Sequence, residues 1–307
     1  MKSISVIIPA YNTALWIEDC IKSIISQSCD ATIEIIVVDD GSTDDTPTIL
    51  SKFKKKYPDT LKIITQPRRG QSVARNKAIE KASGESFIFV DADDTLLPGA
   101  VETLLTTFRN THSPIVCASY LRRPKTGSSH SGKVRTLDYH TAIRTLLYQS
   151  DYSINSSLWG KLFDRKLFDG LRLWEGHIYE DLDIMPRLFL RAGTVSVVDA
   201  PVYFYRRNPD STLSVWNDRR KDMLDVTQRI IDIPEISSDP LLRAAALDRS
   251  FSAACNCLIN MHRYNDRDSA TRERCHAMIK AARQYSLFSR HARLKNRLTA
   301  IISTIFF

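Results

Sequence analysis

Three acidic residues, Asp91, Asp93 and Asp94, directly follow an apolar run over residues 87–90. Asp91 and Asp93 are separated only by the small Ala92, so both carboxylates could surround one hard cation. Mg²⁺ and Mn²⁺ suit oxygen ligands, and Mg²⁺ takes one or two protein carboxylates and completes its shell with water and phosphate oxygens. The motif is short, and an acidic turn that caps the next helix is the other interpretation.

The apolar run itself predicts a strand. Four consecutive apolar residues of β-branched and aromatic type indicate a strand that is buried on both faces, as in a parallel sheet. The acidic residues would then lie just beyond the carboxyl end of that strand, where open α/β sheets bind ligands.

Three earlier strands are predicted over residues 4–8, 33–38 and 61–64, the first ended by Pro9. The predicted helices between them cover about 14–27, the stretch from Ser42 or Thr43 to about Tyr57, and about 72–83. This alternation indicates βαβ units and a right-handed parallel sheet. Polar clusters at 9–12, 39–40, 66–75 and 91–94 each lie at or just after the carboxyl end of a strand. They should therefore gather at one edge of the sheet.

The later part of the chain predicts fewer regular units. We expect a helix entered through Pro98, a strand over 115–120, a mobile loop over 122–135, helices over 138–149 and about 181–192, and two short strands, 195–199 and 202–205, on either side of Pro201. From Trp216 onward the pattern is helical. We therefore predict a first domain over 1–215 and a helical region over 216–307.

Composition limits the class of protein. The chain has 307 residues, of which 43% are hydrophobic and 25% charged, as in ordinary soluble globular proteins. No apolar run reaches the roughly 20 residues that span a bilayer, and the strand that follows Met1 leaves no room for a signal peptide. The six cysteines lack zinc-site spacing, so we expect reduced thiols and a cytoplasmic location.

Five blocks occur in one order along the chain. They are S-V-I-I-P-A-Y-N at 5–12, V-V-D-D-G-S-T-D at 37–44, S-V-A-R-N at 72–76, D-A-D-D at 91–94 and Y-E-D at 179–181. Together they resemble the family 2 inverting glycosyltransferases of bacterial surface-polysaccharide type. The resemblance implies a GT-A (Rossmann-like) α/β fold, with a mostly parallel sheet flanked by helices, and covers residues 3–215 well.

The resemblance also implies a nucleotide-sugar donor, usually UDP-linked, and a divalent cation, Mn²⁺ or Mg²⁺. The sugar would be a hexose or an N-acetylhexosamine. The implied donor-binding residues are Pro9 and Tyr11 beside the base and ribose, Asp40 at the uracil, Arg75, Asp91 and Ala92 at the nucleotide, and Arg206 near the pyrophosphate or acceptor. Asp93, with Asp91, would bind the metal.

The implied general base is Asp181, with Glu180 as its neighbouring candidate. An inverting displacement needs a carboxylate to take the proton of the acceptor hydroxyl, and a cation can neutralise a diphosphate leaving group. Acidic residues at the start of a helix also occur simply because they interact favourably with its dipole. Trp159 and Lys161 are the acceptor-binding candidates, although a buried Trp and a surface Lys explain them equally well.

Two positions depart from the pattern of the resembled family. Arg68 and Arg69 stand where many relatives have a neutral polar pair, and Asp210 stands where many have Gly. Either departure could alter the preference for the donor or the acceptor.

Other functions remain open on the sequence. A nucleotidyltransferase could use a similar sheet and metal, and a non-catalytic nucleotide- or glycan-binding protein is the alternative outside enzymes. A dinucleotide-dependent dehydrogenase is disfavoured because no G-x-G-x-x-G follows the first strand. A receiver domain would be shorter and would not need the block at 179–181.

The tail carries most of the excess positive charge. Residues 280–307 contain six Lys or Arg and no acid, and residues 298–307 are largely apolar. Such a segment can lie at the inner face of a membrane, with its bases at anionic headgroups and Phe306 and Phe307 in the acyl boundary. A helix docked on the catalytic domain is the alternative. Nucleic acid is a less favoured partner, because no aromatic residues alternate with these bases. We expect the acceptor to be a glycan or a lipid-linked glycan.

Overall fold

The computed structural model describes residues 3–123, 131–208 and 215–306, with side chains as far as Ser303. Half of the predicted loop at 122–135 (residues 124–130), and Asp210, lie outside the described residues. The chain forms two compact units. The first comprises Met1–Tyr139, Ser156–Gly176 and Arg187–Asn208, and the second His140–Asn155, His177–Pro186 and Pro209–Phe307. This division cuts the chain at several points, whereas the sequence suggested one boundary near residue 215.

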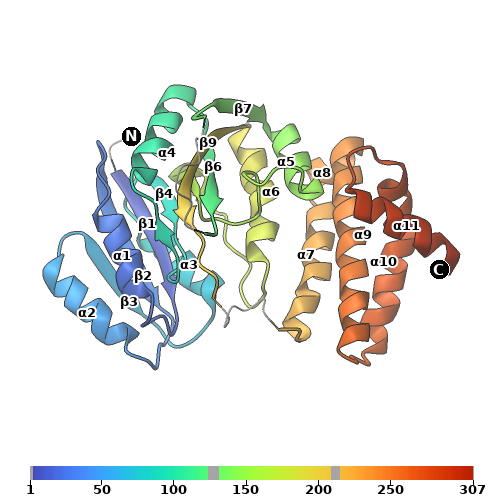
Figure 1. The fold of residues 1–307 in the computed structure, drawn as a ribbon, viewed down its shortest axis with the longest axis horizontal. Coiled ribbons are helices and arrows are strands. Elements are labelled where there is room, and N and C mark those ends of the chain that lie inside the picture. Colours follow the sequence, from blue (N-terminus) through green and yellow to red (C-terminus); the bar gives the residue numbers. More distant parts are fainter. Residues whose placement is uncertain (1–2, 124–130, 209–214, 307) are drawn as a thin grey trace. The chain divides into compact units, whose positions relative to one another are not determined.

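The first unit is built on one mixed sheet (Figure 1) with the strand order β3-β2-β1-β4-β8-β6-β9-β5, and with β7 beside β9. Its first four strands are parallel: β1 (Ser3–Ala10), β2 (Thr32–Asp39), β3 (Leu61–Thr65) and β4 (Ser86–Phe89). β8 (Lys161–Asp164) runs antiparallel to β4 and to β6 (Ile115–Leu121). β9 (Thr194–Phe204) is parallel to β6 and antiparallel to β5 (Thr95–Leu96) and β7 (Val134–Asp138).

Helices alternate with the parallel strands, as the sequence predicts. They are α1 (Ile17–Ile25), α2 (Thr46–Lys56), α3 (Gln71–Lys81) and α4 (Ala100–Thr111), followed later by α5 (Tyr139–Tyr148) and α6 (Glu180–Ala192). The predicted α/β class with a mostly parallel core is confirmed. The antiparallel β8 at its centre is the main departure from a purely parallel sheet.

Several predicted boundaries were wrong. Helix α2 begins at Thr46, because the Ser42 hydroxyl accepts a hydrogen bond from the Asn12 amide and the Thr43 amide donates to the Asn12 side chain. Helix α4 begins after Gly99, which takes a left-handed conformation (φ 74°) that favours glycine. Strand β1 continues through Pro9 to Ala10.

The two short strands predicted around Pro201 form the single strand β9. Its pairing with β6 shifts in register on either side of Ser119, and such an irregularity lets a strand accommodate a proline. Val134 and Arg135, predicted to belong to a loop, begin strand β7.

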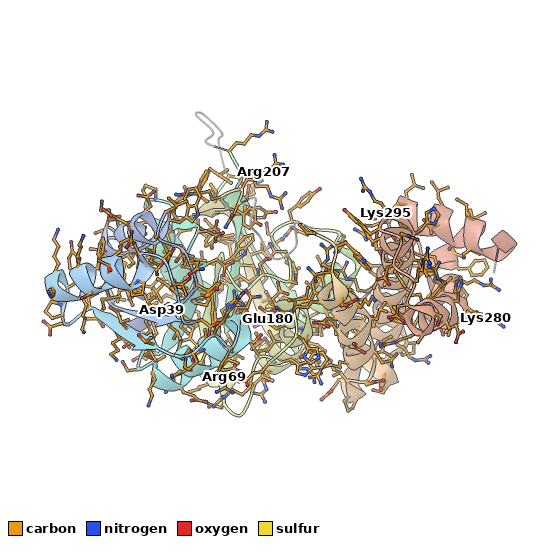
Figure 2. All side chains as sticks on the ribbon, turned by 90° about the horizontal axis from the view of Figure 1, so that it is seen from below. Asp39, Arg69, Glu180, Arg207, Lys280 and Lys295 are labelled. Atoms are coloured by element: carbon orange, nitrogen blue, oxygen red, sulfur yellow. The ribbon has the colours of Figure 1, made fainter. Side chains whose placement is uncertain are left out.

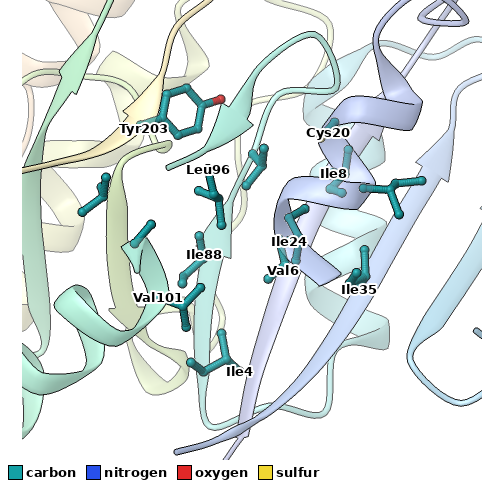
Figure 3. Packing of buried hydrophobic residues seen from close by; sticks show 14 of the residues in the cluster. Ile4, Val6, Ile8, Cys20, Ile24, Ile35, Ile88, Leu96, Val101 and Tyr203 are labelled. Carbon is teal, nitrogen blue, oxygen red and sulfur yellow. The ribbon is translucent and has the colours of Figure 1, made fainter. Parts of the chain in front are cut away.

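The core of the first unit has apolar residues on both faces of its parallel strands. Ile4, Val6 and Ile8 of β1 point to one face, where they meet Ile24 of α1 and Val101 of α4 (Figure 3). Residues at alternate positions of a strand share a face. The intervening Ile7 is also fully buried, which explains the unbroken apolar run in the sequence.

The second unit is helical from residue 215 onward over its described part. Its elements there are the 3₁₀ turn Asp218–Lys221, α7 (Asp222–Ile231), α8 (Pro234–Ser238), α9 (Pro240–Arg263), α10 (Ser269–Phe288) and α11 (Leu294–Phe306). Phe251 and Met261 of α9 pack with Cys275 and Ile279 of α10. All six cysteines are free thiols, as predicted. Among the described residues, no helix is both long and apolar enough to cross a membrane.

Glu34 joins four segments near the amino-terminal end of the first unit's sheet. Its carboxylate accepts hydrogen bonds from the Ser5 hydroxyl at 2.5 Å, the Ser83 amide at 2.6 Å and the Lys62 ammonium at 2.6 Å. Partial burial opposes ionisation, but these donors outweigh it and lower the pKa of Glu34 to about 2. The carboxylate is therefore more stable when ionised in the folded chain.

We expect Glu34→Gln to lower the free energy of unfolding by about 1–3 kcal/mol near neutral pH, since hydrogen bonds to a charged group contribute about this much. Because the folded-state pKa is depressed, this contribution is complete above the ordinary pKa of about 4.5 and is lost as the pH falls toward 2. Urea unfolding of both proteins across this range tests the prediction. A difference that stayed constant with pH would show that the ionised carboxylate is not the stabilising group.

Candidate active site

The loops after β1 and β2 bind each other at the carboxyl edge of the sheet. Asn12, with φ 51°, donates its amide to the Ser42 hydroxyl at 3.0 Å and accepts from the Thr43 amide at 2.8 Å. Thr13 donates its amide to the Thr46 hydroxyl at 2.9 Å. The two sequence blocks at 5–12 and 37–44 thus form one structural element.

Asp40 fixes the loop that follows β3. Its carboxylate accepts hydrogen bonds from the Gln66 side chain at 2.7 Å, the Arg69 amide at 2.8 Å and the Gly70 amide at 2.7 Å. Figure 2 labels Arg69 in this loop and Asp39, the neighbour of Asp40. Gly41 has φ +77°, and a Cβ there would lie 2.9 Å from the Arg68 nitrogen. Asp40 therefore positions this loop, and its predicted contact with uracil stays a prediction.

Tyr11 lies beside that loop. The Arg68 guanidinium lies 4.0 Å from the centroid of the Tyr11 ring, within the range of a cation–π interaction. The departure from the family pattern at Arg68 therefore contacts a predicted donor-binding residue. Pro9 lies two residues earlier in β1 and pairs with Val38 of β2.

The acidic turn after β4 brings together side chains from three parts of the chain. Arg75 of α3 is buried and pairs with Asp91 at 2.7 Å. Asn208, just after β9, donates to Asp93 at 2.9 Å. The Arg206 amide donates to Asp94 at 2.7 Å. The structure thus places the predicted Arg75, Asp91, Asp93 and Arg206 at one site.

The Tyr203 hydroxyl lies between two members of the acidic turn. It accepts a hydrogen bond from the Asp91 amide at 3.0 Å and donates one to the Asp94 carboxylate at 2.8 Å. Asp94 and Tyr203 were not predicted as site residues. Asp94 was visible as the last acid of D-A-D-D, but Tyr203 lies in a run whose pattern indicates only a packed strand.

Burial and the neighbouring acidic charges raise the pKa values of Asp93 and Asp94. Burial, the Asp91 charge and the Asp93 charge raise the pKa of Asp94 to about 8, against the hydrogen bonds from Arg206 and Tyr203. Burial also raises the pKa of Asp93, and Asp91 adds to this effect while Asn208 opposes it. A cation at Asp93 would relieve this repulsion. Two carboxylates with open positions for phosphate and water fit the ligand set of Mg²⁺ or Mn²⁺.

Trp159 belongs to an aromatic cluster beside this turn. Its ring stacks on Tyr203 with centroids 4.7 Å apart and contacts Tyr120 edge-on at 4.8 Å and Tyr205 at 5.5 Å. These contacts account for its packing, and its predicted contact with an acceptor is untested. Lys161 is buried within β8 and donates to the Ser157 carbonyl at 2.7 Å, which favours a structural role for its charge.

Arg206 contacts α1 as well as the acidic turn. Its guanidinium lies 4.6 Å from the centroid of the Trp16 ring and 3.4 Å from the Asp19 carboxylate. The backbone of Arg206 thus binds the acidic turn while its side chain lies against the start of α1. Trp16 was not predicted from the sequence.

The block at 179–181 lies in the second unit. Tyr179 has φ 65°, an uncommon conformation for a non-glycine residue, and helix α6 begins after it. Glu180 is 2% exposed, whereas Asp181 is only partly buried. Asp183, in the first turn of α6, pairs with Arg229 of α7 at 2.8 Å. Of the two base candidates, Asp181 is therefore the more accessible.

Tyr203→Phe should loosen the acidic turn, because the Asp94 carboxylate and the Asp91 amide both lose a partner inside the protein. We expect the free energy of unfolding to fall by about 1–3 kcal/mol. Tyr205→Phe is the matched control, because its ring packs in the same aromatic cluster. Calorimetry of unfolding measures the difference. Equal effects of the two variants would show that the two hydrogen bonds of the Tyr203 hydroxyl have no special role.

The chain is similar in sequence to known glycosyltransferases. Residues 5–169 match the family described as Glycosyl transferase family 2. Glycosyltransferase GlyG of Streptococcus pneumoniae is 29% identical over 240 residues, which cover 74% of this chain and 79% of GlyG. The minor teichoic acid biosynthesis protein GgaA of Bacillus subtilis is 30% identical over 71% of this chain, which spans only 50% of GgaA.

A solved structure shows the same fold. Residues 1–349 of S. aureus TarS, crystallised with UDP-GlcNAc, superpose with a TM-score of 0.69 over 100% of this chain and 92% of that chain, at 23% identity. This likeness confirms the GT-A type of fold. Together with the family match, it shows that the chain is a glycosyltransferase and belongs to glycosyl transferase family 2.

Proposed function

We propose that the chain is an inverting, metal-dependent glycosyltransferase that uses a UDP-linked hexose or N-acetylhexosamine. The acceptor is a hydroxyl of a glycan or of a lipid-linked glycan in surface-polysaccharide synthesis. The observation that carries the proposal is the acidic turn, where Asp91 is paired with Arg75 and Asp93 is held by Asn208. The similarity to TarS, which was crystallised with UDP-GlcNAc, and to GgaA supports the donor and acceptor classes.

Asp93 and Asp91 would hold the cation, Mn²⁺ or Mg²⁺. A bound cation acts as a Lewis acid on the diphosphate leaving group. Arg75 neutralises part of the charge on Asp91 and so limits repulsion between the carboxylates and the phosphates. Arg206, whose backbone binds Asp94, would contribute its guanidinium near the pyrophosphate.

The nucleotide would bind along the carboxyl edge of the first unit's sheet. Tyr11 would stack on the base, and Pro9 would lie beneath the base. The Arg68 guanidinium contacts the Tyr11 ring. Asp40 holds the loop 66–70 that forms the wall beside the base. Ala92 is small and buried, which lets the backbone between Asp91 and Asp93 approach the ribose.

Asp181 would take the proton of the acceptor hydroxyl as the general base. The greater accessibility of Asp181 supports this role over the buried Glu180. Its Oδ1 atom accepts a hydrogen bond from the Leu182 amide at 2.7 Å.

A panel of nucleotide sugars tests the reaction class. The chain should release free UDP from a UDP-sugar in Mn²⁺ in the presence of a glycan or lipid-linked glycan acceptor, and the sugar should appear on that acceptor with inverted configuration. Release of pyrophosphate would instead identify a nucleotidyltransferase. Donor binding without release under any acceptor would favour a binding protein.

Asp93→Ala should abolish metal-dependent UDP binding and transfer while the fold survives, since Asp93 lies in a turn outside the apolar core. Isothermal titration of UDP with and without Mn²⁺, and a transfer assay, measure these effects. Asp59→Ala removes an exposed carboxylate from the loop before β3 and serves as the control. Near-normal turnover of Asp93→Ala in Mn²⁺ would remove Asp93 from the metal site.

Asp181→Asn keeps the shape of the side chain and its bond to Leu182 but removes the proton acceptor. Transfer should fall by a factor on the order of 10²–10⁴ while UDP-sugar affinity persists. In the control Glu180→Gln, burial predicts a loss of thermal stability rather than a comparable loss of transfer. If donor affinity fell in step with turnover in Asp181→Asn, Asp181 would be a binding residue.

A further inference from the structure

Helix α11 presents apolar side chains to solvent. Leu294, Leu298, Ile301 and Ile302 are 69%, 52%, 48% and 54% exposed. The helical period of about 100° per residue places all four within an arc of about 100° on one side of the helix. We call this set the outer face of α11.

The opposite side of α11 is polar and buried. The Asn296 side chain donates to the Asp248 carboxylate of α9 at 3.1 Å, and that carboxylate also accepts from the Ser286 hydroxyl of α10 at 2.6 Å. Ala300 and Ser303, on the same side, are buried as well. A surface helix normally buries its apolar stripe and exposes its polar residues. In α11 this arrangement is reversed, and the polar bonds hold the helix in place.

Basic residues border the outer face on both sides. Lys295 and Arg297 are exposed, and the helical period places them about 20° and 40° beyond the two edges of the apolar arc. Figure 2 shows Lys295 on this part of the second unit, well separated from Lys280 of α10. Residues 280–307 contain no acid that could pair with these bases. The outer face of α11 is thus an apolar strip with a positive margin.

We propose that the outer face of α11 docks on an anionic lipid bilayer, parallel to its surface. The four apolar side chains enter the acyl boundary, and Lys295 and Arg297 contact the anionic headgroups. A second copy of this chain is the poorer occupant, because a two-fold contact would bring the same bases against each other. The side chains of Phe306 and Phe307, predicted to enter the membrane, lie outside those described.

The inference is independent of the metal and of Asp181, but it suits the proposed lipid-linked acceptor, which stays at a membrane surface. Attachment by one helix face lets the enzyme leave the bilayer when the salt concentration rises, because screening weakens the contribution of the bases. Vesicle binding can therefore be measured without any glycosyl transfer.

Co-sedimentation of the whole chain with vesicles tests the proposal. The chain should pellet with phosphatidylglycerol-containing vesicles at low salt, release at high salt, and stay in solution with pure phosphatidylcholine. Leu298→Ser with Ile302→Ser should weaken partitioning by about tenfold or more, and Lys295→Glu with Arg297→Glu should do the same. Both pairs are exposed, so circular dichroism should show an unchanged fold.

Two controls separate the outer face from general effects. Leu241→Ser with Ile259→Ser removes two exposed apolar residues of α9. Arg267→Glu reverses the charge of a base in the turn between α9 and α10. Arg283 of α10 contacts the Ser303 carbonyl of α11, and Arg267 lies roughly 24 Å from Arg283 along the direction of α10. Neither control should change partitioning appreciably.

Equal partitioning of the parent and the two outer-face variants would overturn the proposal, and so would the absence of vesicle binding by the parent. Sedimentation velocity without lipid gives a further decisive result. A dimer of the parent that Leu298→Ser with Ile302→Ser converts to a monomer would assign the face to self-association instead. Failure of the transfer assay with intact vesicle binding would reject the proposed reaction but leave this surface standing.

Discussion

The arrangement of the acidic turn depends on the two hydrogen bonds of the Tyr203 hydroxyl. This one group fixes the Asp91 backbone and satisfies the Asp94 carboxyl. A buried carboxyl without partners costs several times the net contribution of a typical hydrogen bond. Asp94 can therefore be buried only because Tyr203 and the Arg206 amide contact it from β9 and the segment after it. The geometry of Asp91 and Asp93 follows from that anchor, and Trp159 in turn holds the Tyr203 ring by stacking on it.

The same turn concentrates negative charge where the fold offers little compensation. Asp91 is paired with Arg75, but Asp93 and Asp94 are held chiefly by uncharged donors, and burial and the Asp91 charge raise their pKa values. Such an arrangement reduces the stability of the chain by itself, and a bound cation would relieve the repulsion. Perturbed carboxylates of this kind are typical of functional sites rather than of structural ones. In contrast, the Glu34 cluster near the opposite edge of the sheet stabilises its ionised carboxylate with fully formed hydrogen bonds.

The sequence predicted the elements that are local and repetitive. The parallel strands β1 to β4 follow from apolar runs, and the parallel register brings Asp40, Arg75 and Asp91 to one edge. The sequence could not predict partners that lie far apart along the chain. Tyr203 is 112 positions from Asp91, and the apolar run around Tyr203 indicates only a packed strand. Lys161 was predicted to bind the acceptor or to be a surface charge, because lysine is rarely buried, and no local pattern marks its bond to Ser157. In α11 the sequence places apolar and polar residues on different sides of the helix, but only the Asn296–Asp248 contact decides which side faces inward.

The second unit gathers its helices from distant parts of the chain. The His140 ring lies 3.3 Å from the Asp239 carboxylate, and the Ser289 hydroxyl donates to Tyr148, 141 positions earlier, at 3.2 Å. The buried residues of α5 are Ala142, Ile143, Leu146, Leu147 and Tyr148. On the ribosome they emerge long before the helices around them, so the unit can close only when nearly all of the chain has been made. A shorter chain ending near residue 215 would keep the five sequence blocks but remove the partners of His140 and Tyr148 in α5, and incompletely packed chains of this kind are prone to aggregate.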